Sequence, residues 1–167
     1  MNTEYQETYM RLALDEAALD ENEVPVGAVI VRDGQVIAKA HNMRESDPPD
    51  PLGHAELLAL RQAAKVLGTR RLTDCVMYVT LEPCPMCAGA LLQAGLSACY
   101  FGAYDPVQGC CGSVYTLTQD PAFPHRVRTA GGYLRQEAEQ QLSAFFEQKR
   151  TIAPSMDERS NQTALPS

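Results

Sequence analysis

The residues best suited to chemistry are one histidine, one glutamate and two cysteines, which stand in two short motifs. His54 and Glu56 belong to His-Ala-Glu, and Cys84 and Cys87 form a Cys-x-x-Cys pair within Pro-Cys-Pro-Met-Cys. Zinc favours such ligands, and a catalytic zinc typically has three protein ligands and leaves its fourth position to water. We therefore expect zinc ligands at His54, Cys84 and Cys87. Glu56 then places a carboxylate beside that water, and a zinc-bound water with a neighbouring carboxylate can hydrolyse a substrate.

A structural zinc site is the alternative, because such sites close all four positions with protein ligands. His41 or Cys75 would then supply the fourth ligand. The glutamate of His-Ala-Glu and the lack of a second Cys-x-x-Cys pair favour the catalytic form. A non-catalytic, zinc-stabilised binding module remains a rival, and it predicts that Glu56→Ala leaves every activity unchanged.

Two predicted helices must bring the motifs together from their N-terminal ends. Residues 55–67 carry apolar side chains at helical spacing and stop at Gly68. His54 and Glu56 would point about 200° apart in the middle of a helix, so their motif belongs at its beginning. Pro85 suits the first position of a second helix that runs to Gly95. Free N–H groups and the helix dipole at that N-terminus favour the thiolate form that binds a metal.

The remaining pattern predicts a three-layer α/β/α sandwich on a mixed five-stranded sheet. A Thr3–Gln6 capping box opens an expected helix over 3–21, and Asp33-Gly34 predicts a hairpin turn. The expected strands cover 24–31, 36–38, 75–81, 97–101 and 126–129. A last helix over 133–150 is expected to bury Leu134, Ala138, Leu142, Phe145 and Phe146. We expect one domain over residues 1–150 and a disordered tail over 151–167.

The composition argues against a membrane protein and against a secreted one. The 167 residues are 45% hydrophobic, with no apolar run long enough to span a bilayer and no secretory signal. The six cysteines are therefore expected to be reduced thiols of a cytoplasmic protein. Cys75 and Cys99 are expected in the core, and Cys110 and Cys111 in a surface loop.

The formal net charge is −7, which at first argues against a nucleic-acid partner. Most of it lies in residues 1–23, where seven acids face one arginine. A basic series follows, for which RNA contact, dimer contact and a plain solvated surface all stay open: Arg61, Lys65, Arg70 and Arg71.

Several stretches together resemble the bacterial tRNA-specific adenosine deaminases of the cytidine-deaminase superfamily. They are Glu-Val-Pro-Val-Gly-Ala-Val at 23–29, His41-Asn42, His54-Ala55-Glu56, Gly-Thr-Arg-Arg-Leu at 68–72, Thr-Leu-Glu-Pro-Cys-Pro-Met-Cys-Ala-Gly-Ala at 80–90, Phe-Gly-Ala-Tyr-Asp at 101–105 and Phe145-Phe146. The zinc motif marks only the superfamily, whereas the flanking stretches select the tRNA branch.

The resemblance implies a hydrolase that converts the wobble adenosine of the tRNA anticodon to inosine with one Zn²⁺ per subunit. Zinc-bound water would attack C6, and Glu56 would shuttle protons to N1 and to the departing ammonia. Asn42 would hydrogen-bond the purine, Val24 would line the base pocket, and Asp105 would lie near the ribose. The C-terminal helix, with Phe145, would close against the anticodon stem-loop. The resemblance also implies a homodimer.

The nearest rival within enzymes is a deaminase of a free base or nucleoside, such as guanine or cytosine. It shares the zinc motif and would suit an acidic protein. Phe-Gly-Ala-Tyr-Asp at 101–105 and the Phe145-Phe146 helix favour the tRNA branch. Salt-dependent binding of an anticodon stem-loop would distinguish the two classes, because counterion release weakens RNA binding as salt rises.

Overall fold

A mixed sheet of five strands forms the centre of the computed structural model, which describes residues 3–152. Its strands are β1 (Gly27–Arg32), β2 (Gln35–His41), β3 (Cys75–Leu81), β4 (Ala98–Ala103) and β5 (Arg128–Gly131). They lie in the order β2-β1-β3-β4-β5. β1 is antiparallel to β2 and β3, whereas β4 is parallel to β3 and β5. The predicted mixed sheet is therefore confirmed.

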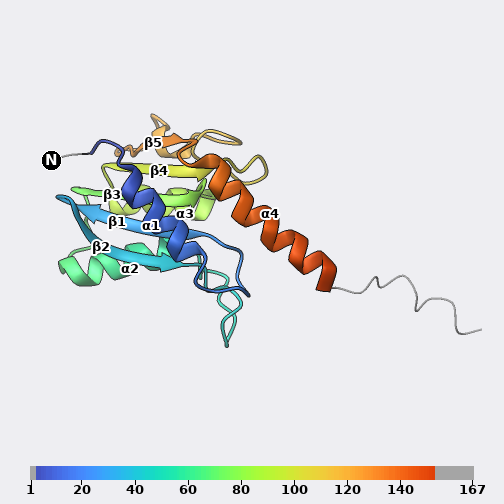
Figure 1. Cartoon of the computed structure of the whole chain (residues 1–167). Coiled ribbons are helices and arrows are strands. Elements are labelled where there is room, and N and C mark those ends of the chain that lie inside the picture. Colours follow the sequence, from blue (N-terminus) through green and yellow to red (C-terminus); the bar gives the residue numbers. More distant parts are fainter. Residues whose placement is uncertain (1–2, 153–167) are drawn as a thin grey trace, which may run out of the picture.

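Helices cover both faces of this sheet (Figure 1). The helices are α1 (Glu7–Ala17), α2 (Ala55–Leu67), α3 (Pro85–Ala94) and α4 (Arg135–Ile152), with a short 3-10 helix, η1 (Leu117–Gln119). Helices α2 and α3 share one apolar core with Ile30 and Met77, and α1 packs on the opposite face against Val29 and Tyr78. α4 lies on the α1 side, where Gln141 donates to the carbonyl oxygen of Leu14. These three layers confirm the predicted α/β/α sandwich.

The β1–β2 hairpin turns at Asp33-Gly34, as predicted. Both residues have positive φ, 49° and 76°, the condition that a two-residue type I′ turn imposes. The twist of this turn matches the twist of the strands that it joins. The hairpin therefore follows from local sequence alone.

The first helix begins later than predicted, at Glu7 instead of Thr3, and no side-chain cap forms at its start. Sheet tyrosines hold the preceding residues outside the helix. The Tyr78 hydroxyl accepts from the backbone N–H of Gln6 and donates to the Glu4 carbonyl, and the Tyr100 hydroxyl donates to the Thr3 carbonyl. Tertiary hydrogen bonds therefore replace the predicted capping box.

The predicted strand over 24–31 is also wrong at its beginning, because β1 starts at Gly27. Val26 donates its backbone N–H to the carbonyl of Val24, which closes a tight turn. Gly27 then donates to the Thr80 hydroxyl of β3. Val24 and Val26 consequently leave the sheet and line a pocket.

The last helix buries much less than predicted. Only Ala138 of the expected apolar side is buried, and Phe146 is 49% exposed. Leu134 precedes the helix, with φ of 49°. Helix α4 packs on β4 near its beginning, and its second half extends past the sheet (Figure 1). An amphipathic pattern alone does not show where a helix leaves the surface that it packs on.

The helices of residues 3–152 include none with the length and apolar composition of a membrane span. Thr151 and Ile152 belong to α4, so the predicted tail does not begin at 151. The rest of that predicted tail lies outside the described residues.

Candidate active site

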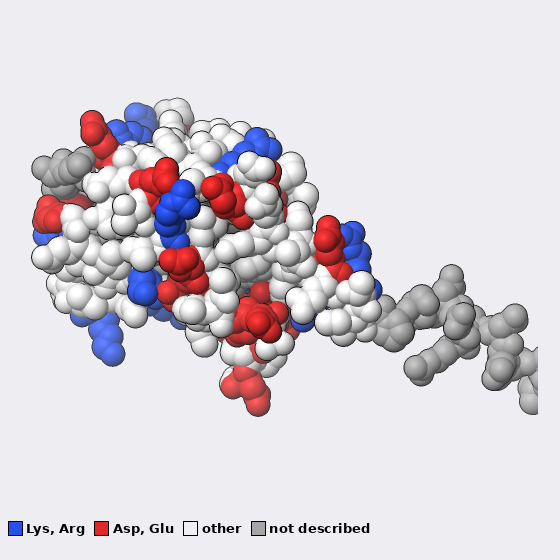
Figure 2. All heavy atoms as spheres, viewed as in Figure 1, with Lys and Arg blue, Asp and Glu red and all other residues white. Residues whose placement is uncertain are grey.

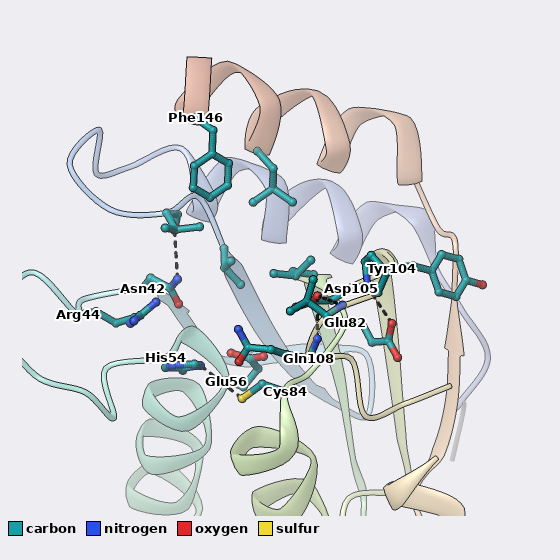
Figure 3. Close-up of a pocket in the computed structure, with 16 residues that line it drawn as sticks. Asn42, Arg44, His54, Glu56, Glu82, Cys84, Tyr104, Asp105, Gln108 and Phe146 are labelled. Carbon is teal, nitrogen blue, oxygen red and sulfur yellow. Dashed lines mark hydrogen bonds between the residues drawn. The ribbon is translucent and has the colours of Figure 1, made fainter. Parts of the chain in front are cut away.

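The two motifs meet at the N-termini of α2 and α3, next to the carboxyl ends of β3 and β4 (Figure 3). Ligand sites of α/β sheets lie at these strand ends. His54 is the N-cap of α2, and Glu56 stands in its first turn. Cys84 is the N-cap of α3, Pro85 is its first residue, and Cys87, two residues further along the helix, is buried. The predicted placement of both motifs at helix beginnings is confirmed.

The three expected ligands face one another at distances that suit a metal. His54 Nδ1 lies 3.7 Å from the Cys84 sulfur and 3.6 Å from the Cys87 sulfur. Zn–S bonds of about 2.3 Å and Zn–N bonds of about 2.05 Å at a tetrahedral angle place N and S roughly 3.6 Å apart. The donor set therefore fits zinc without any rearrangement.

Hydrogen bonding between the two cysteine side chains favours the thiolate form of Cys84. The hydrogen bond from Cys87 lowers the pKa of Cys84 to about 5, and backbone donors and the charge of His54 act in the same direction. The same pairing raises the pKa of Cys87, with burial adding to it. A metal that binds both sulfurs must therefore displace the Cys87 proton.

Glu56 is the buried acid of the site. Its side chain is 4% exposed, and burial raises its pKa to about 7. Among residues 3–152, no group hydrogen-bonds its Oε2 atom, although that atom is buried. A carboxyl group with such a pKa can both accept and release a proton near neutral pH.

Neither candidate for a fourth protein ligand lies at the site. The only metal-type cluster that residues 3–152 contain is His54, Cys84 and Cys87. His41 instead pairs with Glu16, its Nδ1 lying 3.3 Å from the carboxylate. Cys75 begins β3, at the opposite end of that strand from the motif that follows Leu81. The geometry thus favours a site with an open fourth position.

A pocket of about 470 Å³ opens above these residues, a volume typical of small-ligand sites. Val24, Asn42 and Asp105 line it, and the substrate contacts expected of them stay predictions. Asn42 joins two walls, since its Oδ1 accepts from the Ala55 N–H at 3.0 Å and its Nδ2 donates to the Val24 carbonyl at 3.2 Å. Asn42 therefore also supports the helix that carries His54.

The two phenylalanines of α4 have different surroundings. Phe146 lines the pocket and hangs over its opening in Figure 3. Phe145 borders a separate hollow of about 300 Å³ between α4 and the segment after α1. The substrate contact predicted for Phe145 stays a prediction, and it would require the substrate to extend beyond the pocket.

Several pocket residues were missed by the sequence analysis: Arg44, Glu82, Tyr104 and Gln108. The sequence could have indicated Glu82 as a pocket residue, because it is an acid directly after a buried apolar strand. The others lie in loops whose direction no local pattern reveals.

The remaining cysteines and basic residues lie away from the pocket. Cys75 and Cys99 are buried as predicted, but Cys110 and Cys111 are buried too, at 5% and 7% exposure, so the surface-loop prediction was wrong. Arg61 and Arg70 border a hollow between α2 and α3. Arg70 and Arg71 also border a smaller one beside His125.

Known proteins with similar sequences identify the family. The family model described as MafB19-like deaminase matches residues 3–149. The tRNA-specific adenosine deaminase of Bacillus subtilis (strain 168) is 46% identical over 146 residues, which cover 86% of this chain and 90% of that protein. The chain belongs to the tRNA-specific adenosine deaminases. Deaminases of this family are hydrolases within the cytidine-deaminase-like fold.

Solved structures agree with this membership of the tRNA-specific adenosine deaminases. A structure from a study of A-to-I editing by tRNA:A34 deaminases at the wobble position of transfer RNA superposes with a TM-score of 0.77 and 40% identity, covering 82% of this chain and all of that one. The guanine deaminase from Nitrosomonas europaea has a TM-score of 0.69 and 22% identity, covering 84% of both chains, and shares the fold alone.

Proposed function

We propose that this enzyme hydrolyses adenosine at the wobble position of tRNA, position 34, to inosine and ammonia. One observation carries the proposal: the triangle of His54, Cys84 and Cys87 stands beside the buried Glu56 at the base of an open pocket. Membership of the tRNA-specific adenosine deaminases supports adenosine in tRNA as the substrate.

His54 Nδ1 and the sulfurs of Cys84 and Cys87 would hold one Zn²⁺ per subunit. When bound there, Zn²⁺ would lower the pKa of a coordinated water and so supply a nucleophile near neutral pH. Glu56 accepts the proton of the attacking water and passes it to N1 of adenine. It then carries the second proton of that water, from the new hydroxyl group at C6, to the amino group at C6, which leaves as ammonia while C6 becomes the carbonyl of inosine.

The walls of the pocket orient the nucleotide. Asn42 keeps one amide proton and one oxygen lone pair beyond its two protein contacts, and these suit the purine edge. Val24 packs against the base. Asp105 uses Oδ1 to accept from the N–H groups of Val107 and Gln108, so its Oδ2 suits the ribose 2′-hydroxyl. Phe146 offers its ring to a neighbouring base.

The negative net charge leaves only parts of the surface suited to RNA. Figure 2 shows acidic side chains over the centre and lower part of the face covered by α1 and α4, with single basic side chains among them. We assign the anticodon stem-loop to the rim of the pocket instead, where Arg44 lies. Lys149 and Arg150 add positive charge in the last turn of α4, where the Lys149 ammonium lies over the Phe145 ring.

We also propose a homodimer that acts in the cytoplasm, where tRNA is available. The hollow between α2 and α3 supports the dimer, because its lining combines apolar side chains with Arg61 and Arg70. Light scattering of the purified protein tests it, with a single-chain mass of 18.3 kDa as the contradicting result.

The test of function is inosine formation in an anticodon stem-loop with adenosine at position 34. Free adenosine, guanine and cytosine serve as parallel substrates. Inosine in the RNA that Glu56→Ala abolishes, with zinc retained, supports the proposal. Turnover of a free base without any RNA product would assign the enzyme to small-molecule deamination and would contradict the roles of Asp105 and Phe146.

A further inference from the structure

Glu82 is a buried acid for which the zinc chemistry has no use. It follows β3 directly, and only 2% of its surface is exposed. Its Oε1 accepts from the backbone N–H groups of Cys111 and Ser113 at 3.0 and 2.9 Å. Its Oε2 accepts from the Asp105 N–H at 3.0 Å and from the Ser113 hydroxyl. Burying a carboxylate is costly unless donors surround it, and here four donors do.

All four donors belong to one segment, residues 105–113, whose first four residues line the pocket. Gly109 shows how tightly this segment wraps the carboxylate. A Cβ atom at Gly109 would lie 2.4 Å from the carboxyl carbon of Glu82 and 2.5 Å from the Asp105 carbonyl oxygen. The segment therefore has little freedom to pack differently while Glu82 is in place.

The position of Asp105 depends on this arrangement. Its backbone N–H is bonded to Glu82, and its carboxylate accepts from Val107 and Gln108, which follow it in the same segment. A shift of the segment would thus move the Asp105 carboxylate relative to the pocket. Both Glu82 oxygens are occupied by the segment, so Glu82 acts through its neighbours and does not act on a substrate.

We propose that Glu82 is a positioning residue, whose buried carboxylate holds segment 105–113 so that Asp105 meets the ribose of the target nucleotide. The proposal rests on the proposed function. It gives the glutamate before Pro83-Cys84 a task separate from zinc binding. The consequence is that substrate affinity and zinc binding can be separated by mutation at neighbouring positions.

Glu82→Gln tests this with almost no change of shape. An amide has one oxygen and one NH₂ group, so at least one backbone N–H of the segment loses its acceptor. Leaving one buried donor unpaired predicts a roughly tenfold rise in KM for the stem-loop. We expect kcat to change less than about threefold and zinc to stay at one per chain. Amide hydrogen exchange should accelerate in 105–113.

A double-mutant cycle with Asp105→Ala separates positioning from general stability. If Glu82 acts through Asp105, adding Glu82→Gln to Asp105→Ala raises KM by less than about threefold. A further tenfold rise would overturn the proposal. Tyr78→Phe is the matched control, because it also removes buried hydrogen bonds but on the α1 face of the sheet. It should lower the melting temperature without changing KM.

Ser113→Ala serves if Glu82→Gln does not fold, because it removes one of the four donors and leaves the acid in place. A raised KM then supports the positioning role, and an unchanged KM overturns it. Failure of the wild type to form inosine would refute the proposed function together with the ribose contact. Wild-type activity with unchanged KM in Glu82→Gln would overturn the positioning role alone.

Discussion

Glu56→Gln should abolish most of the activity while making the metal-free protein more stable at alkaline pH. Glutamine has nearly the shape of glutamate but cannot carry a proton between water and adenine. General acid–base groups contribute about 10²–10⁴ in rate, so kcat should fall by at least about 100-fold. Zinc should remain bound, since none of its three expected ligands changes.

The gain in stability follows from burial. The pKa of Glu56 is about 7 in the folded chain against 4.5 for an ordinary glutamate. The folded state therefore binds more protons than the unfolded state between these values, and this group's contribution to stability is lost as pH rises from about 4.5 through 7. The difference corresponds to roughly 3 kcal/mol at pH 8, or roughly 6 to 12 °C in melting temperature. The Glu56→Gln variant has no ionisable group at this position, so it does not lose this stability as pH rises.

The assay is thermal unfolding of both chelator-treated proteins between pH 4.5 and 8. The quantity to compare is the melting temperature of the variant minus that of the wild type, because this difference isolates the titration of Glu56, including its repulsion by the Cys84 thiolate. We expect this difference to grow with pH and to level off above pH 7. A difference that does not change with pH would refute the burial argument. A kcat within tenfold of wild type with zinc bound would refute the catalytic role.

Three further predictions concern a pocket residue, a tyrosine on the α1 face of the sheet and an expected zinc ligand. Asn42→Ala leaves the buried N–H of Ala55 and the carbonyl of Val24 unpaired. The free energy of unfolding in urea should therefore fall by roughly 2 to 4 kcal/mol. A fall below about 1 kcal/mol would contradict the contribution of the two hydrogen bonds. Burial raises the pKa of Tyr78 to about 12, so the stability of the wild type should fall as pH rises from 10 to 12. The fall should be less steep in Tyr78→Phe. Equal slopes of melting temperature against pH in the two proteins would count against this. Cys87→Ala should lower zinc content well below one per chain by elemental analysis, while Asn42→Ala retains it; full zinc occupancy in Cys87→Ala would exclude this cysteine as a ligand.

The acidic charge of the chain does not predict the class of its substrate. The N-terminal acids account for most of the charge, and only Glu7, Asp15 and Glu16 of them belong to α1. The pocket lies elsewhere, between the helix N-termini and α4 (Figure 3). Net charge is a sum over the whole chain, whereas RNA meets one local surface.

The sequence by itself determined the features that short-range physics controls. Asp33-Gly34 specified a hairpin because only certain residues accept positive φ at both turn positions. The spacing of His54 and Glu56 placed that motif at a helix start, and Pro85 did the same for the cysteines. Alternating strands and helices then gave the layered fold.

Only the tertiary structure decided the features whose partners lie far along the chain. Tyr78 displaced the start of α1 by binding Gln6 across 72 residues, and no local pattern contains that bond. Phe146 faces the pocket because α4 runs past the sheet, which depends on how the helix docks. Glu82 finds donors between 23 and 31 residues further on, in a loop with no periodicity. Local propensity and periodicity describe what a segment can form, whereas burial and long-range hydrogen bonds decide which of its groups meet.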